Sequence, residues 1–128
     1  MVTGSGKEHR IGGAGNVALN VVAIGSSVTI ISVTGNADEG NRLLSLLNDN
    51  KINTDYLCKT DERITTNKIR IISSNQHMMR LDAEMISPLS EKEEHKLIES
   101  FTSFAEKEKP QLVNMEDYNK GLLTENVI

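Results

Sequence analysis

The chain has 128 residues, with 14 Lys and Arg against 18 Asp and Glu, which gives a net charge of −4 when its three histidines are neutral. A chain of this length can bury a core, and its single cysteine, Cys58, cannot form an internal disulfide, so we expect a soluble protein of a reducing cytoplasm. No apolar run approaches the ~20 residues of a membrane span, and a chain with no basic stripe, two Phe, two Tyr and no Trp is not expected to bind membrane or nucleic acid.

Helices and strands alternate over the first part of the chain. Residues 16–24 are apolar on nearly every side and are followed by Gly25, which predicts a short buried helix. Residues 28–33 are almost all β-branched and predict a strand buried on both faces. Residues 38–50 carry four leucines at helical spacing, which predicts a second helix.

A hairpin interrupts this alternation. Residues 54–58 predict a short strand, and residues 64–72 and 77–84 predict two longer strands joined by the turn at 73–76. Because one face of this hairpin is polar, we expect it to form a small sheet that stands outside the main one.

The last third of the chain returns to helix and strand. Ser90 and Glu93 form a capping box, which predicts the start of a helix that Pro110 ends. Residues 111–115 then predict a strand, and residues 116–121 predict the loop that follows it.

The order of these elements predicts an α/β fold with a parallel sheet flanked by helices. In such sheets ligands bind at the carboxyl ends of the strands. Thr124 can cap one more helix, of which the chain holds only the first turn before Ile128. We therefore expect the chain to be incomplete.

The glycine-rich segment before the first helix is the first candidate binding site. Residues 13–18 satisfy the dinucleotide pattern G-x-G-x-x-A, but the polar residues 7–10 stand where an apolar strand should precede it. Asn16, beside glycine N–H groups, can instead bind sugar hydroxyls or an anion. The alternative is a tight turn into a buried helix.

The hairpin is the second candidate site, because it carries Lys68, Arg70, Gln76 and Arg80. Guanidinium groups suit the bidentate capture of phosphate. Cross-strand salt bridges on an exposed face are the alternative for these residues.

The loop at residues 117–121 is the third candidate site, because it follows a strand whose end should face the ligand. Asp117 can accept hydrogen bonds from sugar hydroxyls, and Lys120 can pair with a phosphate; a turn with an ion pair is the alternative. The three histidines lie on separate predicted elements and the cysteine is single, so no metal site is expected.

Four motifs resemble those of a known family when they are taken together. Residues 10–20 resemble the first motif of the ribokinase-like, or pfkB-type, carbohydrate kinases. Residues 65–70, 75–84 and 117–121 are similar to the kinase half of the bacterial bifunctional ADP-heptose synthases, although His77 stands where those proteins usually have glutamine.

The resemblance implies a three-layer α/β/α fold with a small β lid at about residues 64–84, a lid that often serves for dimerisation. Residues 1–128 would then be the N-terminal part of a single kinase domain, incomplete at both ends. The resemblance places two further regions of the family downstream of Ile128: the Asn-x-x-Glu region that serves magnesium, and the Gly-Ala-Gly-Asp loop that supplies the anion hole and the general base. We therefore expect ATP and Mg²⁺ to bind only in the complete enzyme, no catalytic or metal-binding residue in this chain, and no activity of the chain alone.

The implied reaction is transfer of the ATP γ-phosphoryl group to O1 of D-glycero-β-D-manno-heptose 7-phosphate, for the ADP-heptose of bacterial lipopolysaccharide core. Another ribokinase-like kinase acting on an unphosphorylated sugar, and a non-catalytic domain that binds sugar phosphate or dimerises, are the alternatives. The substrate-binding residues that the resemblance implies are Gly13, Asn16, Lys68, Arg70, Gln76, Arg80, Asp117 and Lys120.

Overall fold

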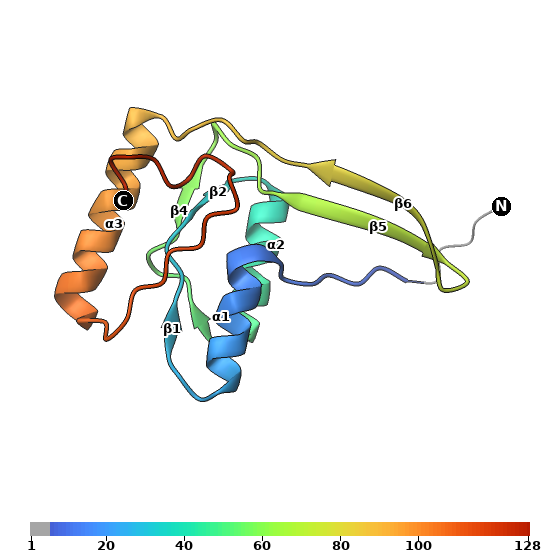
Figure 1. Ribbon diagram of the computed structural model, residues 1–128, viewed down its shortest axis with the longest axis horizontal. Helices are drawn as coiled ribbons and strands as arrows, with labels where there is room; N and C mark the ends of the chain where they lie inside the picture. The colour runs from blue at the N-terminus through green and yellow to red at the C-terminus, as the bar shows by residue number, and fades with distance from the viewer. Residues whose placement is uncertain (1–5) are drawn as a thin grey trace.

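Short strands lie between helices in the computed structural model, which describes residues 6–128. One helix, α3, covers one side of the strands, and two helices, α1 and α2, cover the other side (Figure 1). This layered arrangement of helices and strands confirms the predicted α/β class. The elements in chain order are α1 (Gly13–Ala23), β1 (Val28–Thr29), β2 (Val33–Gly35), α2 (Asp38–Asp49), β3 (Ile52–Asn53), β4 (Cys58–Thr60), β5 (Asn67–Ser73), β6 (Gln76–Ala83) and α3 (Glu91–Glu108).

Two parallel strand pairs form the centre of the fold, with β1 beside β3 and β2 beside β4. The prediction of one continuous strand at 28–33 is wrong, since the chain forms two short strands there. The prediction of a strand at 54–58 is also wrong, because the Leu57 amide donates to the Thr54 carbonyl (3.1 Å) in a turn. That turn separates β3 from β4, and the gap between their partner strands β1 and β2 lies opposite it.

The buried core lies where α1, α2 and β3 meet. Ala18, Leu47 and Ile52 form its centre, and Leu47 and Ile52 are each only 1% exposed. Burying a side chain of this size stabilises the fold by roughly 1.5–3 kcal/mol. On the other side of the strands, the rings of Tyr56 and Phe104 meet edge to face with centroids 5.3 Å apart, which holds α3 to the strands.

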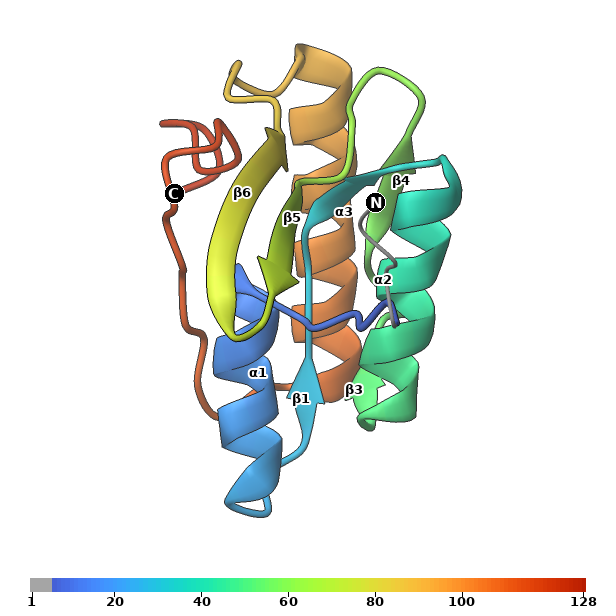
Figure 2. The same cartoon turned by 90° about the vertical axis from the view of Figure 1, so that its right-hand side faces the viewer.

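The predicted hairpin is confirmed as β5 and β6, an antiparallel pair that projects from the rest of the chain (Figures 1 and 2). Ser74 and Asn75 join the strands with positive φ angles of 49° and 62°, as a two-residue hairpin turn requires. The pairing register shifts between Ile71 and Ile72.

The end of the chain differs from the prediction. Residues 111–115 are not a strand: among the described residues, no backbone hydrogen bond joins this segment to a neighbouring strand. The local pattern favours an extended backbone, and the segment is extended, but a strand also needs a partner. The loop at 116–121 is present as predicted, and at the end the amides of Val127 and Ile128 bond to the Thr124 carbonyl in a single turn.

No helix within residues 6–128 has the length and apolar character needed to cross a bilayer.

Candidate functional site

The start of α1 lies against the loop at residues 117–121. Gly13 begins the helix with a φ of +56°, and a Cβ atom placed on it would lie 3.9 Å from Cε2 of Tyr118. Asn16 is exposed one turn further along α1. No side chain caps the helix and no acidic residue lies in its first turn, so its N–H groups keep their partial positive charge.

The loop itself is a tight turn. Oδ1 of Asp117 accepts a hydrogen bond from the Asn119 amide at 2.8 Å, and Asn119 has a φ of +55°. Asp117 remains exposed, so its other lone pairs are free to accept from a ligand. The loop therefore presents a carboxylate close to the start of α1.

Lys120 connects this loop to the base of the hairpin. Its Nζ donates to Oε2 of Glu84, the residue directly after β6, at 2.6 Å. This hydrogen bond lowers the pKa of the Glu84 carboxyl, and the positive charges of Lys120, Lys68 and Arg80 lower it further, against partial desolvation. The charged face of the hairpin is thus electrostatically coupled to the loop.

That face of the hairpin carries two guanidinium groups opposite each other. Arg70 on β5 pairs in register with Arg80 on β6, and Lys68 pairs with Asp82. Nε of Arg80 lies 3.2 Å from Oδ1 of Asp82, whereas Arg70 has no ion-pair partner among residues 6–128. Like charges opposite one another are unfavourable, so an anion bound near Arg70 would relieve the repulsion.

Gln76 lies at the far end of the hairpin from the Lys120 contact. It pairs with Ser73 beside the turn of the hairpin, at the opposite end of β6 from Glu84. Glu84 follows Gln76 by eight residues, and a strand rises about 3.3 Å per residue, so Gln76 lies roughly 25 Å along the strand from the Lys120 contact.

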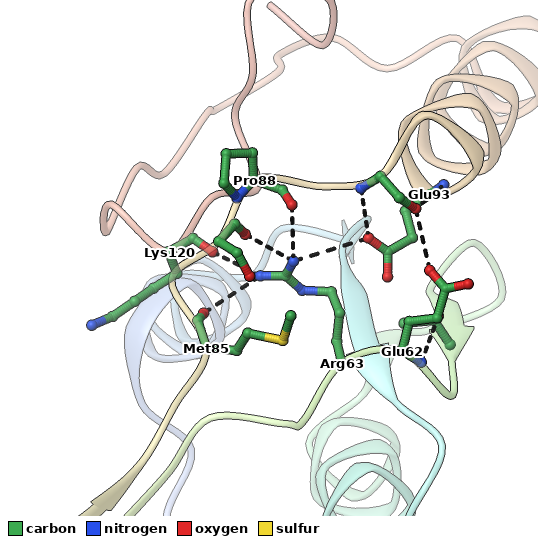
Figure 3. Close-up of polar contacts among 9 residues, drawn as sticks. Glu62, Arg63, Met85, Pro88, Glu93 and Lys120 are labelled. Atoms are coloured by element: carbon green, nitrogen blue, oxygen red, sulfur yellow. Dashed lines mark hydrogen bonds and ion pairs between the residues drawn. The ribbon is translucent and has the colours of Figure 1, made fainter.

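The sequence interpretation missed Arg63. In the chain it follows Asp61 and Glu62 and resembles part of a solvated charged run, yet its side chain is only 7% exposed. Figure 3 shows its guanidinium among backbone carbonyls of two segments: residues 85–88, which follow the hairpin, and the Lys120 loop. No local motif indicates this burial, because the partners lie more than twenty residues away in the chain.

Most of the chain matches a known protein family. Residues 1–117 match the pfkB family of carbohydrate kinases. The chain belongs to this family. The resemblance found in the first motif is therefore confirmed, and a pfkB-type fold accounts for the helix-flanked parallel strands and the projecting hairpin.

This pfkB chain is similar to several bifunctional HldE proteins. That of Pelobacter propionicus is 36% identical over 122 residues, which cover 95% of this chain and 25% of that protein. That of Aliarcobacter butzleri is 38% identical over 114 residues, 89% of this chain and 24% of the relative. The chain thus spans about a quarter of the length of these relatives.

A solved structure supports the fold. The crystal structure of an uncharacterized sugar kinase from Pyrococcus horikoshii has a TM-score of 0.50 to this chain at 23% identity, covering 60% of this chain and 25% of that one. This likeness supports the ribokinase-like α/β fold of the pfkB chain.

Proposed function

We propose that this chain carries most of the sugar-phosphate site of a bacterial, cytoplasmic heptose 7-phosphate kinase, an enzyme that phosphorylates O1 of D-glycero-β-D-manno-heptose 7-phosphate. The identity to HldE proteins over nearly the whole chain supports this substrate class. The observation that carries the proposal is the junction of three sequence-distant parts at Lys120: its loop, the start of α1 and the cationic face of the hairpin.

The side chains at this junction suit a phosphorylated sugar. Asp117 and Asn16 offer oxygen atoms that accept from hydroxyl groups, and close approach of the sugar to the backbone is possible at Gly13. Arg70 and Lys120 can neutralise the phosphate. We assign the same role to Lys68 and Arg80, and a hydroxyl contact to Gln76 once the hairpin approaches the sugar.

No group of three His, Cys, Asp or Glu side chains within residues 6–128 is arranged to hold a metal ion. We propose that ATP and Mg²⁺ bind to other parts of the complete enzyme, and we assign no step of phosphoryl transfer to the residues of this chain.

Replacing Lys120 with methionine tests the sugar-phosphate site. We expect the Kd for heptose 7-phosphate, measured by isothermal titration calorimetry, to rise about tenfold to a hundredfold, because a charge-assisted hydrogen bond contributes about 1.5–3 kcal/mol. The Kd for the unphosphorylated heptose should change little. The matched control is Lys59→Met, since Lys59 also holds a side-chain oxygen, Oδ1 of Asn41 at 2.9 Å, but on β4.

The outcome separates the candidate functions. Equal binding of the phosphorylated and unphosphorylated sugars by the wild-type chain would favour a kinase for an unphosphorylated sugar. If Lys120→Met binds heptose 7-phosphate as tightly as the wild type, Lys120 does not belong to the site.

The face of the hairpin opposite Arg70 and Arg80 supports a second element of the proposal, a homodimer formed through the lid. Ile69, Ile71, Met79 and Leu81 lie in two directly opposed pairs on this face, and each is between 39% and 51% exposed. A second copy of the chain would remove this apolar surface from water.

Replacing Ile71 with aspartate tests the lid dimer. We expect the wild type to sediment as a dimer and Ile71→Asp as a monomer, because the carboxylate would be buried without a partner. The control is Ile24→Asp, at an 81% exposed position just after α1, which should leave the dimer intact. A wild-type chain that stays monomeric at high micromolar concentration would contradict this element.

A further inference from the structure

Arg63 joins the hairpin to the Lys120 loop through its guanidinium group. Nη1 donates to the Ser87 carbonyl and Nη2 to the Lys120 carbonyl, both at 2.9 Å (Figure 3). Longer bonds reach the carbonyls of Pro88 at 3.5 Å and Met85 at 3.4 Å. Residues 85–88 are the segment by which the hairpin returns to the rest of the chain, so one side chain holds two segments that both lead into the proposed site.

The same guanidinium is tied to the start of α3. Nη1 lies 3.9 Å from Oε2 of Glu93, whose side chain is only 5% exposed. That oxygen also accepts from the Ser90 amide at 2.9 Å, while the Ser90 hydroxyl accepts from the Glu93 amide at 3.3 Å, so the capping box predicted for this helix is present. The carboxylate is therefore fixed in place, and its negative charge holds the guanidinium near the start of α3.

A second set of contacts holds the loop at the same place. The Leu89 amide donates to the Gly121 carbonyl at 3.0 Å. Gly121 has a φ of +79°, and a Cβ atom there would collide with the carbonyl oxygen of Ser87. The backbone on both sides of the Lys120–Gly121 peptide is thus in close contact with the return segment.

We propose that Arg63 is a positioning residue that sets the place of the Lys120 ammonium relative to the hairpin without contacting the sugar. Only a planar group with several donors can bond carbonyls of two segments and face a carboxylate at once; the single ammonium of a lysine cannot span them. Because the Lys120 side chain also bonds to Glu84 at the hairpin base, movement of the loop moves the charge that would meet the phosphate. The effect on affinity rests on the proposed function, whereas the ordering of the loop does not.

The test uses Arg63→Lys and Arg63→Met in the 128-residue chain, with Arg42→Lys and Arg42→Met as controls. Arg42 lies on α2, where it pairs with Glu39 at 3.2 Å and is 39% exposed. Hydrogen exchange of two amides at the loop is measured without ligand, against those of α1 and α2: the Asn119 amide, which donates to Asp117, and the Leu89 amide, which donates to the Gly121 carbonyl of the loop. Titration with heptose 7-phosphate then gives the Kd of each variant.

In Arg63→Lys we expect exchange of the loop amides to accelerate at least tenfold while exchange in α1 and α2 stays at the wild-type rate, and the Kd to rise about tenfold. Neither should change in the Arg42 variants. Unchanged loop exchange in Arg63→Lys would overturn the proposal. Faster exchange throughout the chain, or loss of folding in Arg63→Lys, would also overturn it, because Arg63 would then stabilise the whole fold. If loop exchange responds but the wild type does not bind heptose 7-phosphate, the positioning role stands and the proposed function fails.

Discussion

Replacing Leu47 with alanine is expected to lower the free energy of unfolding by about 2–5 kcal/mol. Leu47 is 1% exposed on the inner face of α2, where it packs with Ala18 of α1 and Ile52 of β3. The substitution removes three carbon atoms from a place that three elements share, and the rigid backbones of two helices limit how far the cavity can collapse. Urea unfolding followed by far-ultraviolet circular dichroism measures the change.

The matched control for this prediction is Leu112→Ala. Leu112 is the same residue type but 83% exposed, in the extended segment after α3, so its truncation should change the free energy of unfolding by less than about 0.5 kcal/mol. Equal losses in the two variants would contradict the assignment of the core to the junction of α1, α2 and β3.

Local sequence patterns were sufficient to predict the helices and the hairpin, although α1 begins at Gly13, three residues before its predicted start. The four leucines at helical spacing predict α2 within one residue of its observed end, and the capping box marks the residue at which α3 begins. They could not predict strand pairing. The apolar segment 111–115 has the composition of a strand but no hydrogen-bonded neighbour among the described residues, and pairing depends on segments far away in the chain.

The same limit on local sequence patterns applies to the candidate site. Short motifs were enough to select Gly13, Asp117 and Lys120, which the structure brings to one region. They could not predict the burial of Arg63, because its contacts join residues separated by 24 and 57 positions. Local patterns identify groups that could meet a ligand, whereas groups that position them depend on tertiary contacts.

Replacing Gly40 with alanine is expected to destabilise the chain by about 1–3 kcal/mol, although Gly40 lies inside α2. Helix propensity alone predicts the opposite sign, a gain of roughly 1 kcal/mol. A Cβ atom at this position would collide with the carbonyl oxygen of Gly35 and would lie 3.1 Å from Oγ1 of Thr65. Because Thr65 Oγ1 accepts from the Gly35 amide at 3.1 Å, the end of β2 is held between the helix and the segment leading into the hairpin and cannot move away freely.

Ser45→Ala provides the control, because Ser45 is exposed on the same helix and its hydroxyl donates only to the Asn41 carbonyl. It should be neutral or slightly stabilising, since alanine is the better helix former. Thermal and urea unfolding of both variants give the comparison. If Gly40→Ala were as stable as Ser45→Ala, α2 would not pack against the end of β2 at this distance. If Gly40→Ala is destabilised as expected, α2 is in direct contact with the end of β2 and with the segment that leads into β5. Displacement of Gly35 would then also disturb the hydrogen bond from the Gly35 amide to Thr65, two residues before β5 begins.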